Sequence, residues 1–334
     1  MIRTKTLAVL LASLASSASL AQSAAPAPER NILTWPMPET VSPEGRTAAI
    51  ASANTPMPNP MPPLPLVRQM IGGMQVAMGK QLEARYGVRT EESVIAGVPV
   101  RIIYPKGVTA IGKGPVLLNL HGGGGKVDSG SLTETIPIAA LTGIPVVSAL
   151  YRLAPENPYP AGLDDALAVY QALEKDHGAS RIGVFGTSAG AVLSAQLVAR
   201  LTVLRRPMPA ALGFFGGMAD ASKKGDSISW MPMPGGEYGA DPVYKIKLTD
   251  PVLSPIHGDL SHFPPTLLIT STRDLALSGT SIFGRALYEQ GVASNLVVFD
   301  ALPHAFWTYL IDIPETDQAN KLIADFLKRR LAAK

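Results

Sequence analysis

The chain has 334 residues, of which 46% are hydrophobic and 16% are charged, and its formal net charge is +3. This composition predicts one globular unit with a sizeable core or a core plus a cap, and the small net charge does not favour a nucleic-acid partner. Because the sequence contains no cysteine, it excludes disulfides and a lipidated cysteine anchor.

The first residues have the pattern of an export signal. Arg3 and Lys5 precede the apolar run 7–14, and small residues follow as far as Ala21. The apolar run is shorter than the ~20 residues that span a bilayer, so we expect no stable membrane insertion. The sequence predicts a signal peptide over 1–21, cleaved near Ala21, and export to the periplasm or the medium.

The next segment, 22–65, is rich in proline, alanine and methionine and predicts an extended or partly ordered lead-in. One domain is expected over 66–334, where candidate strands alternate with helical patterns and so predict an α/β fold, a doubly wound and mostly parallel sheet with helices on both faces. The expected strands are 93–96 and 99–104 (an antiparallel pair), 115–120, 145–150, 181–185, 210–215, 266–271 and 295–299. The expected helices are 66–86, 161–176, 189–204, 278–290 and 315–332.

A glycine-rich loop follows the strand expected over 115–120. His121 leads into four consecutive glycines, Gly122 to Gly125, and a loop without side chains offers backbone N–H groups to a developing oxyanion. A phosphate-binding loop is disfavoured because Val127 stands where that motif needs serine or threonine, and no GxGxxG occurs. We expect His121 to orient the loop through backbone hydrogen bonds.

A nucleophile elbow is predicted around Ser188. The pentapeptide Gly186-Thr187-Ser188-Ala189-Gly190 joins the strand expected over 181–185 to the helix expected over 189–204. A GxSxG turn in this context exposes the serine hydroxyl at the end of a strand. Ser188 is therefore the expected nucleophile, and the N–H groups of Gly122, Gly123 and Ala189 are the expected oxyanion donors.

The acid and the base should follow the serine in chain order in this type of fold. His304 comes just after the strand expected over 295–299, and Asp274 just after the strand expected over 266–271. We expect His304 to be the base and Asp274 the acid, with Asp300 as a less favoured acid because it lies only four residues before His304. The group His257, Asp259 and His262 could suggest a metal site, but loop residues of this kind more often lie at the solvated surface, so no metal or other cofactor is expected.

Several blocks in the right order resemble the hormone-sensitive-lipase-like esterases of bacterial family IV, in the GTSAG subgroup of the α/β-hydrolase fold. Besides HGGG and GTSAG, the chain carries YRLAPE at 151–156, YPAGLDD at 159–165, DPVLSP at 250–255 and a block similar to DLSGLPPTLL at 260–268. The resemblance covers roughly residues 90 to 330. It implies an esterase, a polar network near the site that includes Glu156, and a small cap over the acyl pocket.

Cap segments are expected at 66–90 and at about 220–245. Apolar residues recur every three or four positions in the first segment, which is typical of core packing, but the resemblance places such a helix over the pocket. The second segment is a long loop with large apolar side chains, and long loops at this edge of a sheet are commonly functional. Pocket residues are therefore expected to include Met74, Trp230 and Tyr238.

Together these patterns predict a serine carboxylesterase that hydrolyses short- to medium-chain acyl esters through an acyl-enzyme intermediate. An amidase or peptidase with the same triad is the alternative among hydrolases, and a non-catalytic ligand-binding protein of this fold is the alternative outside them. The sequence leaves open the acyl length, the alcohol, the stereopreference, the choice between ester and amide, and the oligomeric state.

Overall fold

The computed structural model describes residues 35–55, 61–223, 225–230 and 246–332. The chain divides into two compact units, Met1–Arg30 and Asn31–Lys334, and all the described residues belong to the second. The predicted signal peptide over 1–21 lies outside the described residues. The unit that contains the sheet begins well before residue 66, where the domain was expected to start.

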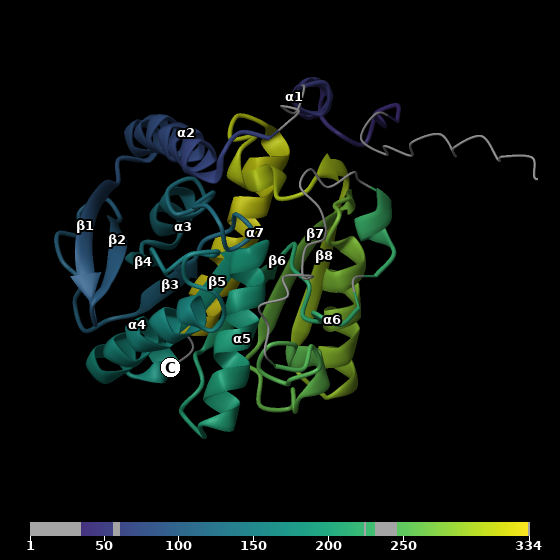
Figure 1. The fold of residues 1–334 in the computed structure, drawn as a ribbon. Helices are drawn as coiled ribbons and strands as arrows, with labels where there is room; N and C mark the ends of the chain where they lie inside the picture. The colour runs from purple at the N-terminus through teal and green to yellow at the C-terminus, as the bar shows by residue number, and fades with distance from the viewer. Residues whose placement is uncertain (1–34, 56–60, 224, 231–245, 333–334) are drawn as a thin grey trace, which may run out of the picture. The chain divides into compact units, whose positions relative to one another are not determined.

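An eight-stranded sheet forms the centre of this unit, with the order β1-β2-β4-β3-β5-β6-β7-β8 (Figure 1). The first two strands pair antiparallel with each other and β2 pairs antiparallel with β4, whereas the remaining pairs are parallel. The mostly parallel sheet predicted from the sequence is confirmed. The strands are β1 Arg89–Ile95, β2 Val98–Tyr104, β3 Val116–Leu120, β4 Val146–Ala149, β5 Ile182–Thr187, β6 Ala211–Phe215, β7 Thr266–Arg273 and β8 Ser294–Pro303.

Two helices were not predicted. The helix α1 lies at 43–53, within the lead-in that was expected to be extended or partly ordered. Ser42 caps this helix by accepting from Gly45 N–H, and Pro43 occupies its first position, a start signal that the sequence does contain. The helix α3 is apolar on nearly every side, so it lacks the polar face that marks a surface helix. The helices are α1 Pro43–Ala53, α2 Leu64–Tyr86, α3 Thr135–Thr142, α4 Ala161–His177, α5 Ala189–Val203, α6 Leu277–Glu289 and α7 Pro314–Ala332.

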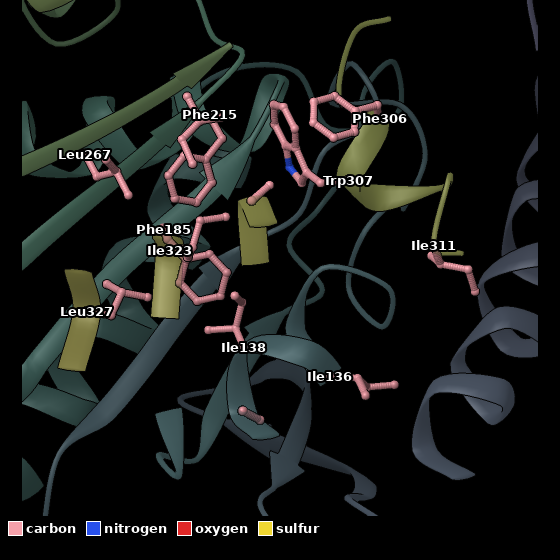
Figure 2. Packing of buried hydrophobic residues seen from close by; sticks show 14 of the residues in the cluster. Ile136, Ile138, Phe185, Phe215, Leu267, Phe306, Trp307, Ile311, Ile323 and Leu327 are labelled. Atoms are coloured by element: carbon pink, nitrogen blue, oxygen red, sulfur yellow. The ribbon is translucent and has the colours of Figure 1, made fainter. Parts of the chain in front are cut away.

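Helices cover both faces of the sheet because the strand residues alternate between two cores. Phe185 and Phe215 point toward the face covered by α3 and α7, where Trp307 stands edge-on to Phe215 with the ring centroids 6.4 Å apart (Figure 2). Their neighbours Val184 and Phe214 point toward the face covered by α4, α5 and α6. The strands that carry the expected site are thus buried on both faces, and their carboxyl ends are held in fixed positions.

Four of these carboxyl ends deliver the expected site residues. The glycine loop follows β3, Ser188 follows β5, and Asp274 follows β7, while His304 comes directly after β8. Ligands of open parallel sheets bind at this edge. The topology therefore places the predicted nucleophile, acid, base and oxyanion loop at one end of the sheet.

Candidate active site

The turn between β5 and α5 has the backbone strain of a nucleophile elbow. Ser188 has φ of 58° and ψ of −123°, a region that residues other than glycine rarely occupy and that costs on the order of 1–3 kcal/mol. The turn is held in place by the Ser188 N–H, which donates to the Phe215 carbonyl at 2.8 Å. A conformation stabilised in this way presents the side chain of Ser188 at the top of the sheet.

The glycines on either side of this turn are required by close packing. A Cβ atom on Gly190 would lie 1.9 Å from the Leu120 carbonyl oxygen, and one on Gly186 would lie 2.3 Å from the same atom. Since real Cβ atoms do not approach an oxygen so closely, only glycine fits at either position. The elbow therefore packs directly against the end of β3, next to the start of the glycine loop.

Ser188, His304 and Asp274 form a chain of hydrogen bonds. The Nε2 atom of His304 lies 2.9 Å from Ser188 Oγ, and its Nδ1 atom lies 2.6 Å from Asp274 Oδ1. Asp274 is fully buried and also accepts from Thr270 Oγ1 at 2.9 Å and from Ala276 N–H at 2.7 Å. The carboxylate is thus fixed by groups other than the imidazole that it holds.

The competing acid lies elsewhere. Asp300 accepts from Thr272 Oγ1 at 3.1 Å and from Thr40 Oγ1 at 2.5 Å, and both contacts are exposed. The structure therefore places Asp274, and not Asp300, against the imidazole of His304.

Opposite charges determine the protonation of the pair. Burial by itself raises the pKa of Asp274, but the charge of His304 and the hydrogen bonds to the carboxylate outweigh burial and lower the pKa overall. For His304, burial lowers the pKa, whereas the charge of Asp274 and its hydrogen bond raise it more strongly, so the net pKa lies above the ordinary value. The imidazole is therefore a stronger base than a free histidine.

A raised histidine pKa predicts how activity depends on pH. A base must be neutral to accept the serine proton, so kcat/KM for an acyl ester should be high above the pKa of His304 and fall as the pH drops through it, beginning above the ~6.5 of an ordinary histidine. In Asp274→Asn the charge is gone and burial remains, so the acidic limb should move to lower pH. Rates measured from about pH 5 to 9 check both statements, and an unshifted limb in the variant would contradict them.

The three expected oxyanion donors lie in the same pocket as Ser188. Ala189 is the first residue of α5, so its N–H is one of the four that a helix leaves without an internal partner, at the positive end of the helix dipole. Gly123 has φ of +107°, and a Cβ atom on it would lie 2.1 Å from the Val127 carbonyl oxygen. The loop that contains Gly122 and Gly123 is thus a tight turn that only glycine can form.

His121 is buried and contacts this loop. Its Nδ1 atom donates to the Gly122 carbonyl at 2.8 Å, and its ring stacks on Tyr151 with the centroids 4.3 Å apart. The hydroxyl of Tyr151 donates in turn to the His121 carbonyl at 2.7 Å. These contacts fit the orienting role expected for His121.

A polar cluster that was not predicted supports the far side of the loop. Asp128 accepts from Ser131 N–H at 2.9 Å and from Arg101 Nη1 at 2.7 Å. Burial raises the pKa of Asp128, but the charge of His121, the hydrogen bonds of Ser131 and the charge of Arg101 hold it at about 2. The sequence contains a signal for this turn, Asp-Ser-Gly-Ser at 128–131, separated by two residues from the last of the four glycines, since aspartate commonly bonds the backbone two or three residues further on.

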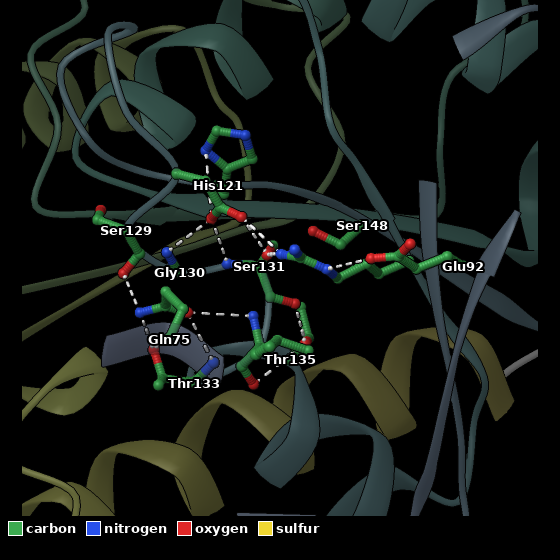
Figure 3. A network of polar contacts seen from close by, with 12 residues as sticks. Gln75, Glu92, His121, Ser129, Gly130, Ser131, Thr133, Thr135 and Ser148 are labelled. Carbon is green, nitrogen blue, oxygen red and sulfur yellow. Dashed lines mark hydrogen bonds and ion pairs between the residues drawn. The ribbon is translucent and has the colours of Figure 1, made fainter. Parts of the chain in front are cut away.

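Glu156 lies at the surface, where it pairs with Arg68 of α2 at 2.7 Å, and this hydrogen bond holds its pKa at about 2. Buried Gln75 of α2 makes the contact that sequence reasoning missed: its amide nitrogen donates to the Ser129 carbonyl at 3.0 Å, and its oxygen accepts from Thr133 N–H at 3.3 Å (Figure 3). The helix α2 is thus attached to the loop segments around the site.

An apolar cavity of about 600 Å³ opens above Ser188. Met74, expected in the pocket, lines it together with the neighbouring Ile71 and Met78 of α2 and with apolar residues from other elements, Leu193, Met218, Ile228 and Leu275. Tyr238 lies outside the described residues, as does the side chain of Trp230. Residues of the first expected cap segment, 66–90, therefore line the cavity, and Ile228 lines it from the described part of the second expected cap segment, 220–245.

The two histidines that could have suggested a metal site, His257 and His262, each pair with a different aspartate. His257 Nε2 lies 3.2 Å from Asp220, and His262 Nε2 lies 3.7 Å from Asp259. Within the described ranges, no cluster of three or more histidine, aspartate or glutamate side chains could hold a metal ion. None of the described helices combines the length and hydropathy needed to cross a membrane.

Comparison with known proteins identifies the family. A family model described as alpha/beta hydrolase fold matches residues 117–308. An ethyl acetate hydrolase of Pseudomonas putida is 28% identical over 257 residues, covering 70% of this chain and 79% of its own.

Solved structures agree with this match. The crystal structure of an esterase E25 is 32% identical, with a TM-score of 0.77, and covers 89% of this chain and 97% of its own. A hormone-sensitive lipase from a metagenome library is 28% identical, with a TM-score of 0.73, and covers 84% and 95%. The chain therefore belongs to the α/β-hydrolase fold family, among its hormone-sensitive-lipase-like carboxylic ester hydrolases.

Proposed function

We propose that the protein is a serine carboxylesterase that cleaves short- to medium-chain acyl esters through an acyl-enzyme intermediate. The observation that carries this proposal is the hydrogen-bonded chain from Ser188 through His304 to buried Asp274, at the wall of an apolar cavity. A serine hydroxyl is a weak nucleophile unless an adjacent base removes its proton, and this arrangement supplies the base and the group that orients it.

The reaction follows from these positions. Ser188 Oγ attacks the ester carbonyl while His304 Nε2 takes the hydroxyl proton, and Asp274 stabilises the resulting imidazolium. The N–H groups of Gly122, Gly123 and Ala189 stabilise the negative charge that forms on the carbonyl oxygen. His304 then protonates the leaving alkoxide, and water, activated by the same imidazole, releases the acid from Ser188.

The cavity supports small apolar acyl groups. Its volume of about 600 Å³ is within the range of small-ligand pockets, and the methionine and isoleucine side chains of α2 offer an apolar wall. A relative of this chain is named for the hydrolysis of ethyl acetate, an ester with a short acyl group.

Hydrolysis rates for a series of aryl esters of increasing acyl length, with an aryl anilide as control, test the proposal. We expect the highest kcat/KM among short and medium acyl chains and a much slower anilide. Comparable rates for the anilide would indicate an amidase, and binding without hydrolysis would indicate a ligand-binding protein.

Met74 should limit the acyl length because its side chain lines the cavity. It is 53% exposed, so a larger side chain can be accommodated there without disturbing the core. Met74→Trp should lower kcat/KM for medium-chain esters by about tenfold or more while acetyl esters are nearly unaffected, since each methylene in an apolar pocket is worth roughly 1–3 kcal/mol. Met70→Trp is the matched control, since Met70 is 52% exposed on the same helix and does not line the cavity. Identical chain-length profiles for the two variants would show that α2 does not set specificity.

We also propose that the protein is exported, on the sequence of residues 1–21. Amino-terminal sequencing of the protein recovered from its native compartment should start near Gln22. An intact Met1 would contradict cleavage.

A further inference from the structure

A buried glutamate that the proposed mechanism does not use lies beneath the site. Glu134 precedes α3, and 1% of its surface is exposed. Its Oε1 atom accepts from Thr187 Oγ1 at 2.6 Å, and its Oε2 atom accepts from Asn119 Nδ2 at 3.1 Å. Both partners stand at the ends of strands that deliver parts of the active site.

The surroundings make this carboxylate unfavourable for stability. Burial raises the pKa of Glu134 to about 7, the hydrogen bonds from Thr187 and Asn119 oppose the rise, and the charge of Asp128 adds to it. The carboxylate of Glu134 is thus hydrogen-bonded to two neutral donors, Thr187 and Asn119, and the charge that acts on it, that of Asp128, has the same sign. A buried carboxylate held in this way costs folding free energy, so its presence calls for another explanation.

The position of Glu134 supplies that explanation. Asn119 lies in β3, two residues before His121 and the glycine loop, and Thr187 is the last residue of β5, directly before Ser188. A Cβ atom on Gly130 would lie 3.2 Å from Glu134 Oε2, so the far end of the glycine loop, at Gly130, also packs against the carboxylate. One side chain therefore contacts the strand that carries the nucleophile and both ends of the loop that carries the oxyanion donors.

The partners of Glu134 are themselves fixed. Thr187 Oγ1 accepts from Trp307 Nε1 at 3.0 Å, so its own proton is directed at the carboxylate. The Asn119 side-chain oxygen accepts from Ser148 Oγ at 2.7 Å, so its amide nitrogen is directed at the carboxylate as well. The network thus requires a group at 134 that accepts on both oxygens, as a carboxylate does and an amide does not.

We propose that Glu134 is a positioning residue that fixes the distance between Ser188 and the oxyanion loop by bonding to β3 and β5 at once. The inference rests on the proposed function, since it concerns the geometry of the same attack. A group that acts in this way should affect kcat much more than KM, because misplacement of reacting groups by about 1 Å can cost on the order of a hundredfold in rate.

An exchange of the two side chains tests the proposal. Glu134→Gln leaves either two amide N–H₂ groups facing each other or the Thr187 proton without its acceptor, and Asn119→Asp places two carboxyl groups together. The double variant Asn119→Asp with Glu134→Gln restores a matched donor and acceptor. At about pH 8, Glu134→Gln should lower kcat for an aryl acetate by about ten- to a hundredfold with KM nearly unchanged. The double variant should recover most of that loss.

Two controls separate positioning from folding. Glu315→Gln alters another buried glutamate, which accepts from Ser42 N–H at 2.6 Å outside the cavity, and it should leave kcat unchanged. If Glu134→Gln does not fold, Thr187→Val and Thr187→Ser decide, because valine removes the hydroxyl and serine keeps it. The valine variant should then be at least about tenfold slower than the serine variant.

The outcomes distinguish this inference from the proposed function. An active wild type with unchanged kcat in Glu134→Gln, or a double variant as slow as the product of the two singles, would overturn the positioning role alone. A wild type that hydrolyses no acyl ester would overturn both.

Discussion

Replacing Ser188 with alanine should lower kcat for an aryl acetate by about 10⁵- to 10⁶-fold, because the triad acts as a unit and no other group takes the place of the nucleophile. The fold should remain intact, since alanine can adopt the same backbone conformation and loses only the hydroxyl that His304 contacts. The melting temperature and the circular dichroism spectrum should match those of the wild type.

A second buried serine provides the control. Ser194 lies in α5, six residues after Ser188, and its hydroxyl donates to the Gly190 carbonyl at 2.8 Å. Ser194→Ala should hydrolyse the ester at close to the wild-type rate. Ester hydrolysis that survives in Ser188→Ala would remove the nucleophile assignment.

Exchange of Asp274 for asparagine should lower kcat on the order of 10⁴-fold. The asparagine amide keeps the size of the carboxylate, but it can present N–H₂ to His304 Nδ1 and so favour the imidazole tautomer that cannot take the serine proton. The loss should appear in kcat and leave KM nearly unchanged, because Asp274 is buried beneath the imidazole and does not line the cavity.

Asp300→Asn is the matched control for this prediction. Asp300 is the other carboxylate near His304 in sequence, and its contacts are with Thr40 and Thr272. This variant should keep a rate close to that of the wild type. A larger loss in Asp300→Asn than in Asp274→Asn would reverse the acid assignment.

Local patterns in the sequence predicted the parts of the site that depend on strand ends. Ser188, Asp274 and His304 each follow a short apolar run, and parallel strands bring their carboxyl ends together whatever the details of packing. The strand and helix pattern gave the sheet correctly for the same reason. A motif that follows such a run can be placed in the fold from one sequence, because the apolar run itself predicts the strand that precedes the motif.

Other parts of the site depend on contacts between distant segments and left no local signal. Gln75 resembles any polar residue on a surface helix, yet it is buried because the loop 129–133 folds over it. Glu134 stands before a helix without a polar face, so neither its burial nor its partners could be read from periodicity. Glu156, which the resemblance implied in a polar network near the site, pairs with Arg68 at the surface, and Arg68 also donates to the carbonyls of Lys126 and of Ala154, which lines the cavity.

The close packing of Gly186 and Gly190 on β3 has a consequence for laboratory evolution. A library that varies these positions samples variants whose side chains collide with the Leu120 carbonyl, so almost every member is lost before selection for activity begins. The cavity face of α2 has open space instead, and Met74 there can change size at little cost. We therefore expect variants with new substrate preferences to carry mutations in the helix above Ser188, and we expect the turn that carries Ser188 to keep its sequence through successive rounds of selection.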